Sequence, residues 1–264
     1  MARIKPALFC SAFFLCISMQ WLFCELPRCW GTQERSEQFM RMSQHGVMPT
    51  ERTAVAVRMT ELADAEGFPK HSSWDIAKAL RFDEDWQGKN ADPHRETEVR
   101  LLWTPDTLYL RFLAKYRVIT VFHDAGPDGR RDQLWDRDVA EVFLQPDPSS
   151  PRRYKEFEVS PNGFWIDLDI APGEKHDFKS GLRRRVILDQ ATRTWVAELA
   201  LPMKCLVEHF EPAATWKVNF YRVEGATEPR FYSAWRPTRT PVPNFHIPEA
   251  FGELMFMSSP SRQE

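Results

Sequence analysis

Short segments in which apolar and polar residues alternate, each closed by turn-forming residues, run along most of this chain and restrict it to a β-rich fold. Residues 97–103 place Val99, Leu101 and Trp103 on one face, because successive side chains of a β-strand point to opposite sides. A Thr-Pro-Asp-Thr turn follows, and the alternation resumes over residues 108–114. The two segments together predict a β-hairpin.

Similar segments recur towards the C-terminus, separated by turns rich in proline, glycine and asparagine. The Asn-Gly pair at 162–163 is typical of a tight hairpin, since both residues readily adopt positive φ. Residues 202–210, opened by a proline, predict one short helix. The other strand candidates are residues 139–145, 154–160, 164–170, 183–188, 194–201, 216–223, 231–235 and 252–256. About nine or ten strands with so little helix predict an all-β, antiparallel, jelly-roll-like β-sandwich.

The N-terminus has the pattern of an export signal. Arg3 and Lys5 form a basic start, and residues 7–23 are almost wholly apolar. We therefore expect residues 1–30 to be a signal peptide or a retained signal anchor, residues 31–52 a flexible polar spacer, and residues 53–258 the folded domain. Export would place the protein in the periplasm or outside the cell, with membrane attachment only if the segment is retained.

Two further observations bear on the N-terminus. Four of the five cysteines lie in the first 30 residues, so cleavage would leave Cys205 alone and exclude an internal disulfide. A start at Met40, Met42 or Met48 is the remaining alternative, and it would remove the apolar segment altogether.

The charge balance excludes one class of partner. The formal net charge is -2, with 35 basic and 37 acidic residues, so no excess of positive charge favours nucleic acid. The sequence contains neither a nucleophile motif of the serine or cysteine hydrolases nor a phosphate-binding loop. We therefore expect a binding protein without catalytic residues.

The segment 135–144 carries the clearest functional signal. Trp135 is followed by an acidic cluster and then by an apolar strand that contains Glu141. Val139, Glu141 and Phe143 share one face of this strand, opposite to an apolar face. An aromatic ring beside a fixed carboxylate suits a sugar, because the ring stacks on its C–H face while the carboxylate accepts hydrogen bonds from its hydroxyls.

From about Trp74 to Phe256 the chain resembles a family 9 carbohydrate-binding module. The residues that carry the resemblance are the hairpin at 98–103 and 108–110, the segment 135–144, the strand 154–159, and Trp235 with 243–245 and 250–252. The resemblance implies a β-sandwich that binds oligo- or polysaccharide without cleaving it, linked to polysaccharide breakdown.

The resemblance also implies site residues. Two aromatic rings that hold a sugar between them would be Trp135 and Phe245, and hydroxyls would be held by Glu141 and Asn244. Arg222 and Arg236 are expected as neighbours of the site. Three positions depart from the family pattern: Phe245 stands where the family has a tryptophan, Glu158 where it has an arginine, and Val242 where it has an asparagine.

Other readings stay open at this point. Related β-sandwiches bind haem, for which Met203, Met255 and His246 are available as axial ligands. A glycosidase would need paired carboxylates, and the candidate pair is Glu141 with either Glu156 or Glu158. The resemblance implies that structural Ca²⁺ is possible, with oxygens from the aspartates at 124, 128, 132, 136 and 138, but their spacing does not match an EF-hand loop and favours a solvated loop. No zinc site is expected, because His123 and His176 lack a second ligand at zinc spacing.

Overall fold

Thirteen strands form one hydrogen-bonded sheet in the computed structural model, which describes residues 52–259. The strands are β1 (Thr53–Arg58), β2 (Leu80–Phe82), β3 (Thr97–Thr104), β4 (Thr107–Lys115), β5 (Val139–Gln145), β6 (Tyr154–Val159), β7 (Trp165–Ala171), β8 (Glu174–Asp177), β9 (Arg183–Asp189), β10 (Thr194–Pro202), β11 (Trp216–Glu224), β12 (Phe231–Ala234) and β13 (Gly252–Met257). The helical segments are α2 (Met203–Leu206) and the 3-10 turns His71–Ile76, Pro93–Arg95, Leu134–Asp136 and Pro248–Ala250.

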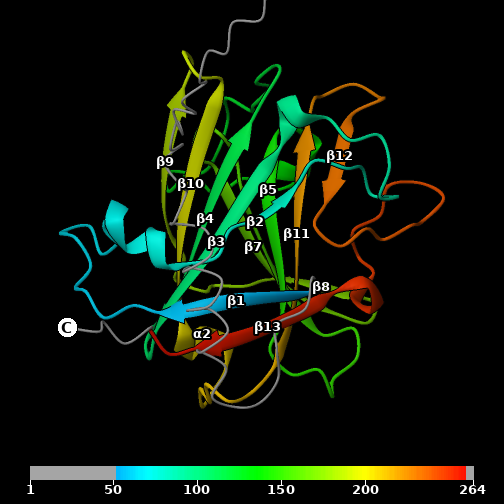
Figure 1. Cartoon of the computed structure of the whole chain (residues 1–264). Coiled ribbons are helices and arrows are strands. Elements are labelled where there is room, and N and C mark those ends of the chain that lie inside the picture. Colours follow the sequence, from blue (N-terminus) through cyan, green and yellow to red (C-terminus); the bar gives the residue numbers. More distant parts are fainter. Residues whose placement is uncertain (1–51, 260–264) are drawn as a thin grey trace, which may run out of the picture.

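The sheet curls on itself to make the two layers of a β-sandwich. Its strand order is β8-β7-β6-β5-β11-β13-β1-β3-β4-β10-β9, with β12 added to β11 and β2 added to β3. Strands β13 and β1 stand in the middle of this path and join the two layers, and Figure 1 shows them crossing one end of the sandwich. The predicted fold class is therefore confirmed.

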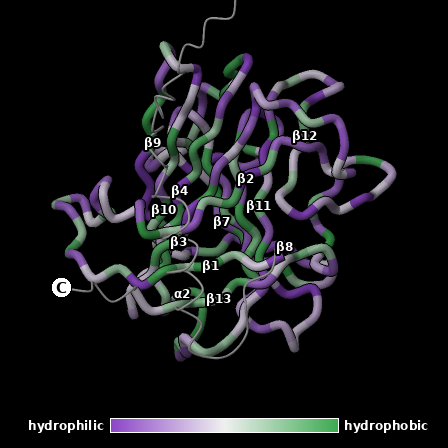
Figure 2. The backbone as a smooth tube through the Cα atoms, viewed as in Figure 1, coloured by the Kyte–Doolittle hydropathy of each residue, from purple (hydrophilic) through white to green (hydrophobic). Residues whose placement is uncertain are grey.

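The main core lies between the two layers. One layer contributes the apolar faces of β3, β4 and β10, and the other those of β5, β6 and β11. Trp103, Trp195 and Trp216 all belong to this core, as the alternation of their strands predicts. Figure 2 shows hydrophobic residues along β1, β13 and β11, whereas many of the surrounding loops are hydrophilic.

Three features differ from the sequence-based expectation. The sheet has 13 strands rather than nine or ten, because β1, β2 and β8 were not anticipated. The sheet is mixed rather than purely antiparallel, since β1 pairs in parallel with both β13 and β3. The predicted helix at 202–210 shortens to α2, because Val207 already has an extended backbone.

A second, smaller core covers the outer face of β5, β6, β7 and β11. Ala140, Val142 and Leu144 of β5 point between the layers, whereas Val139 and Phe143 point outwards into this second cluster. The cluster also contains Phe245 and Phe251, which lie outside the strands in the segment between β12 and β13. Both faces of β5 are consequently buried, and Glu141 shares its outer face with apolar neighbours.

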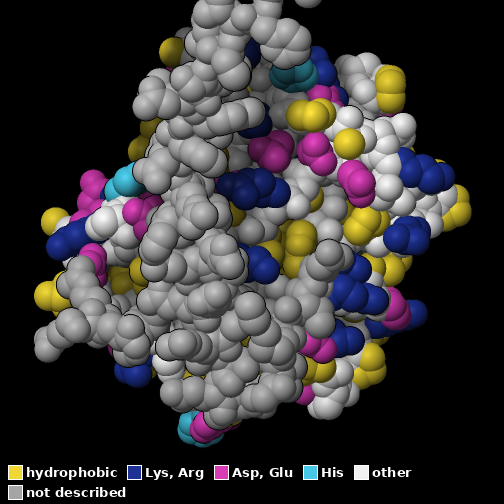
Figure 3. Space-filling view, viewed as in Figure 1, with side chains coloured by type: hydrophobic (Ala, Val, Ile, Leu, Met, Phe, Trp, Pro, Cys, Tyr) yellow, Lys and Arg dark blue, Asp and Glu magenta, His cyan; other side chains and the backbone are white. Residues whose placement is uncertain are grey.

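The predicted signal segment at 1–30 and the spacer at 31–52 lie outside the described residues, apart from Arg52. Within 52–259, no helix has the length and apolar character needed to cross a bilayer. On the part of the described surface visible in Figure 3, basic and acidic side chains are interspersed.

Candidate functional site

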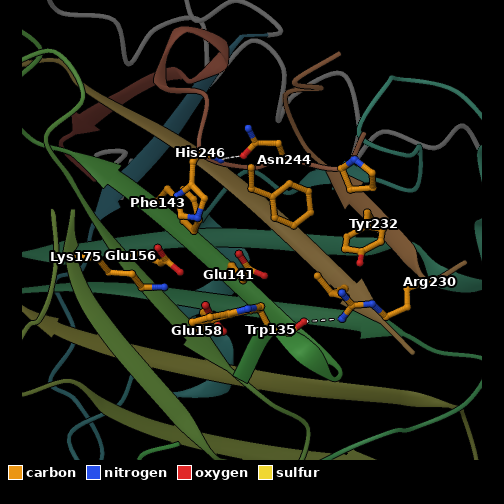
Figure 4. A pocket seen from close by; sticks show the side chains of 13 residues that line it. Trp135, Glu141, Phe143, Glu156, Glu158, Lys175, Arg230, Tyr232, Asn244 and His246 are labelled. Carbon is orange, nitrogen blue, oxygen red and sulfur yellow. Dashed lines mark hydrogen bonds between the residues drawn. The ribbon is translucent and has the colours of Figure 1, made fainter. Parts of the chain in front are cut away.

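A cavity of about 250 Å³ opens above the outer face of β5 and β6, within the second core. Its floor comes from these two strands, and its walls come from β8, the β12 region, the 3-10 turn Leu134–Asp136 and the segment before β13. Figure 4 shows the carboxylates of the floor between Trp135 on one side and Asn244 on the other. The lining residues are Trp135, Glu141, Phe143, Glu156, Glu158, Lys175, Val223, Arg230, Tyr232, Pro243, Asn244, Phe245 and His246.

Three glutamates dominate the floor. Glu141 on β5 stands directly opposite Glu158 on β6, and Glu156 stands opposite Phe143, one pleat further along the same face. One carboxylate oxygen from each of the three lies within 4.8 Å of the others. The relative exposures of Glu141, Glu156 and Glu158 are 2%, 2% and 0%. Such a set of like charges at opposed strand positions ordinarily destabilises a sheet.

These carboxylates lack the partners that buried charges normally have. Within residues 52–259, no donor contacts either carboxylate oxygen of Glu158, Oε1 of Glu141 or Oε2 of Glu156. Burial raises the pKa of Glu158 well above its usual range, and the charges of Glu141 and Glu156 raise it further. Burial likewise raises the pKa of Glu141, with Glu156 as the next cause. The floor therefore retains protons that an exposed carboxyl would lose, unless a positive charge replaces them.

Trp135 forms one wall and is partly exposed. The Nη1 atom of Arg230 donates a hydrogen bond to the backbone carbonyl of Trp135 at 2.8 Å, which ties this turn to the strand β12 region. The ammonium of Lys175 lies 3.7 Å from the centre of the indole ring, a cation–π contact. Lys175 reaches this position from β8, and its charge lowers the pKa of both Glu141 and Glu158.

Phe245 forms the facing aromatic wall. Its ring stacks on Tyr221 with centroids 4.2 Å apart and an interplanar angle of 14°, and it meets Tyr232 edge-on. The hydroxyl of Tyr221 donates to the backbone carbonyl of Phe245 at 3.0 Å and accepts from Nδ2 of Asn219 at 2.8 Å. The segment that carries Phe245 is thus fixed to β11 through both ring and backbone.

Polar groups at the rim are held by specific contacts. Nδ1 of His246 is 2.6 Å from the hydroxyl of Tyr154, and desolvation lowers the pKa of this imidazole. The side-chain oxygen of Asn244 accepts from the backbone N–H of His246 at 3.0 Å, so its amide NH₂ group is the donor left for a ligand. Tyr232 donates to Glu228 at 2.5 Å, and this bond, as the largest cause, lowers the pKa of Glu228 to about 2.

The structure brings four of the six predicted site residues together. Trp135, Glu141, Asn244 and Phe245 line one cavity, although they are up to 110 positions apart in the numbering of the chain. They come from a turn, a strand and the segment before β13, which the sheet topology places side by side.

Arg222 and Arg236 are placed elsewhere and do not line the cavity. Arg222 lies on the same face of β11 as Phe220, which points between the two layers, and its guanidinium lies over the ring of Trp195. The guanidinium is also 3.7 Å from the carboxylate of Asp138 and 3.6 Å from that of Glu224. The guanidinium of Arg236 lies 5.9 Å from the ring of Trp235. Neither arginine therefore lines the cavity, although the charge of Arg222 is one of those that lower the pKa of Glu141, which burial raises.

Several lining residues were missed or assigned other roles. Lys175, Arg230 and Tyr232 were missed. Lys175 lies on β8, which contains no apolar residue, and Arg230 and Tyr232 lie beside and on β12, whose pattern predicts a strand but not a site. Glu156 was considered only as a glycosidase carboxylate and His246 only as a haem ligand, whereas Glu158 was also expected at the position of a family arginine. The three glutamates lie together because of the register in which β5 and β6 pair, and this register is known only from the structure of the sheet.

The other ligand expectations look different in three dimensions. In the described part of the chain, the acidic group compact enough to share one metal ion is Glu141, Glu156 and Glu158, rather than the aspartates of the 124–138 loop. Asp138 instead lies buried beside Arg222 and accepts a hydrogen bond from Gly225 N–H at 2.7 Å. Met203 belongs to the core between the layers, away from the lining of the cavity that holds His246.

Two solved structures share this fold, and one curated protein is similar to this chain in sequence. A structure from Bacteroides uniformis has a TM-score of 0.61 at 19% identity, covering 77% of this chain and 98% of that one. A family 9 carbohydrate-binding module from Caldicellulosiruptor kristjanssonii, in complex with cellotriose, has a TM-score of 0.55 at 13% identity, covering 80% and 97%. An "Extracellular protein" of Arthroderma benhamiae is 27% identical over 184 residues, 62% of this chain and 80% of that protein.

The match to a protein family establishes more about this chain than these pairwise similarities do. Residues 86–256, well over half of the chain, match Carbohydrate-binding family 9. This span contains every residue that lines the cavity and all strands except β1, β2 and the last residue of β13. The chain is therefore a member of Carbohydrate-binding family 9, a family of non-catalytic binding modules.

Proposed function

We propose that this protein binds a carbohydrate, without cleaving it, in the cavity between Trp135 and Phe245. The observation that carries the proposal is the meeting of an accessible indole ring with buried, unpartnered carboxylate oxygens in one cavity. Membership of the family supports it, as does the fold shared with a module that holds cellotriose.

The chemistry of the cavity suits a sugar ring. The C–H face of a pyranose stacks on an aromatic ring, and its hydroxyls are donors that the carboxylates of Glu141 and Glu158 lack. Asn244 offers its amide NH₂ group to a hydroxyl oxygen at the opposite rim. The buried carboxylate oxygens of the floor that lack a hydrogen-bond donor would thereby gain one from the sugar.

Lys175 has a defined part in this proposal. Its ammonium covers the indole ring of Trp135 but is attached to an exposed edge strand, so it can move with little loss of packing. A sugar that stacks on Trp135 would displace the ammonium towards the carboxylates, where it would donate to ligand hydroxyls.

The ligand is expected to extend beyond one sugar ring. Trp135 and Lys175 also line a second hollow of about 680 Å³, together with residues such as Asp128, Arg130 and Asp177. The first cavity alone is smaller than the roughly 300–1,000 Å³ of most small-molecule sites. An oligosaccharide or polysaccharide that passes Trp135 would use both hollows.

We further propose that the protein is exported and serves polysaccharide breakdown as a non-catalytic partner. The apolar N-terminal segment and the extracellular description of the Arthroderma benhamiae relative support export. The carbohydrate would then be met in the periplasm or outside the cell.

Titration calorimetry of the purified chain against mono- and oligosaccharides tests the function. Trp135→Ala is expected to weaken binding at least about tenfold, equivalent to 1.4 kcal/mol, because it removes the stacking surface. Phe210→Ala is the control, since Phe210 is a partly buried aromatic residue packed against the main core that lines neither hollow. Unchanged affinity in Trp135→Ala would contradict the stacking role, and silence across the panel would contradict the function.

A further inference from the structure

The floor of the cavity holds more negative charge than its surroundings balance. Glu141, Glu156 and Glu158 present three carboxylates. Two cationic side chains line the cavity, and one of them, Arg230, is committed to Glu228 through its Nε and to the Trp135 carbonyl through its Nη1. The other is Lys175, a single charge placed over the Trp135 ring.

We propose that Glu141, Glu156 and Glu158 bind a hard divalent cation, with Ca²⁺ as the preferred ion. Ligand oxygens on opposite sides of a Ca²⁺ ion held at about 2.3–2.6 Å lie about 4.6–5.2 Å apart. Three oxygens within 4.8 Å of one another can therefore all reach one such ion with small side-chain adjustments.

The unpartnered oxygens are the independent observation behind this assignment. Buried carboxylates normally accept hydrogen bonds, pair with a base or coordinate a metal. Glu158 is fully buried, and across the described residues neither of its oxygens meets a donor. Glu141 and Glu156 each have one further buried oxygen that lacks a donor, and the carboxylates of all three glutamates lie close together (Figure 4).

The donor set selects the class of ion. The group consists of carboxylate oxygens alone, which suit hard cations such as Ca²⁺, Mg²⁺ and Mn²⁺ rather than zinc or copper. The nearby imidazole of His246 is engaged with Tyr154 through Nδ1. Mg²⁺ demands near-ideal octahedral geometry at about 2.0–2.1 Å and gives up its waters reluctantly, whereas Ca²⁺ tolerates the irregular, wider triangle that two strands provide.

Three protein oxygens leave a Ca²⁺ ion incomplete, because it takes about 6–8 oxygen ligands. The remaining positions face the cavity, where water or a pair of adjacent sugar hydroxyls can fill them. This second role rests on the proposed carbohydrate binding. It makes the two ligands mutually reinforcing, since each would bind more tightly when the other is present.

The first test measures the cation alone. Chelator-treated, purified full-length chain is titrated with CaCl₂ by calorimetry in the absence of sugar, and MgCl₂ is titrated in parallel. We expect one Ca²⁺ site per chain, within the roughly 10⁻⁴–10⁻³ M range of extracellular modules or tighter, and weaker binding of Mg²⁺. No saturable binding of any divalent ion by the wild-type chain would overturn the proposal.

Variants locate the site. Glu158→Gln is expected to weaken Ca²⁺ binding at least tenfold, because it removes a charge and a ligand without changing the size of the side chain. Glu174→Gln is the matched control, since Glu174 is an exposed glutamate of β8 that lies outside the cavity lining. Circular dichroism of each variant establishes that it is folded. Wild-type Ca²⁺ affinity in a folded Glu158→Gln chain would overturn the assignment.

A sugar titration with Ca²⁺ and with chelator separates the two proposals. Sugar affinity that falls at least about fivefold in chelator supports the completed coordination sphere. Sugar binding by a chain that binds no Ca²⁺ overturns the cation site and leaves the carbohydrate function standing. Ca²⁺ binding by a chain that ignores every sugar supports the cation site and counts against the carbohydrate function.

Discussion

Replacing Glu158 by glutamine should stabilise the metal-free protein at alkaline pH and leave it nearly unchanged at acid pH. In the native state, burial and two neighbouring carboxylates raise the pKa of Glu158. In the unfolded chain the glutamate titrates near its ordinary value of about 4.3. Between these two values the native state binds more protons than the unfolded state, so the free energy of unfolding decreases as pH rises.

The expected size follows from the environment of the side chain. A buried polar group without a partner costs about 1–3 kcal/mol, and Glu158 has two such oxygens. The glutamine amide carries no charge, and its NH₂ group can donate to the unpartnered Oε1 of Glu141 and Oε2 of Glu156. We expect Glu158→Gln to raise the free energy of unfolding by about 1–3 kcal/mol at pH 8 and by much less at pH 4.5.

Urea denaturation at both pH values, in metal-free buffer, measures this difference. Wild type, Glu158→Gln and the surface control Glu174→Gln are compared at matched ionic strength. The wild type should lose stability between pH 4.5 and pH 8 more steeply than the Glu158→Gln variant, and the control should follow the wild type. A Glu158→Gln chain that is less stable than wild type at pH 8, or that keeps the full pH dependence, would refute the account of the cavity floor.

Two further substitutions probe how the site is held in place. Tyr221→Phe removes a hydroxyl that bonds both the Phe245 carbonyl and Asn219, so we expect a loss of about 1–3 kcal/mol in unfolding experiments and weaker sugar binding; full affinity would show that the Phe245 segment does not depend on this bond. Gly252→Ala would bring a Cβ to 2.6 Å from a backbone carbonyl and 2.7 Å from the Trp235 ring, so we expect a loss of about 1–3 kcal/mol, and an unchanged melting temperature would contradict this close approach.

The fold was largely predictable because the apolar residues that alternate along the sequence are the ones that face the core. Val99, Leu101 and Trp103 point into the core, and the hairpin around Asn162 forms, although Gly163 and not Asn162 has the positive φ. The strand β8 could not be predicted in this way, because its sequence Glu-Lys-His-Asp contains no apolar residue and all four are exposed. An edge strand of this kind owes its shape to its pairing with β7 rather than to burial.

Site residues that stand out in the local sequence pattern were predictable, whereas those that reach the cavity through the pairing of strands were not. Trp135 and Glu141 stand out because a solvated aromatic and a charged strand residue are each unusual. Arg222 could have been excluded, since it shares the parity of Val218 and Phe220, which point between the layers. Lys175 reaches the cavity because β8 pairs with β7 at the edge of the sheet, and no local pattern carries that information.

The register of two strands explains why this cavity needs a ligand. Shifting β6 by one residue would turn Glu156 and Glu158 into the core and bring Phe157 and Val159 out, so the apolar face of β6 fixes both carboxylates beside Glu141. The core thus imposes a repulsion between carboxylates that the charge of Lys175 relieves only in part, since the pKa of Glu141 and of Glu158 stays raised. Protons, a divalent cation and the hydroxyls of a sugar are three ways to relieve it, and they compete or cooperate at the same oxygens. As pH rises and these carboxyls lose protons, the stability of the metal-free protein should therefore fall while its cation affinity rises, because one set of unpartnered atoms governs both.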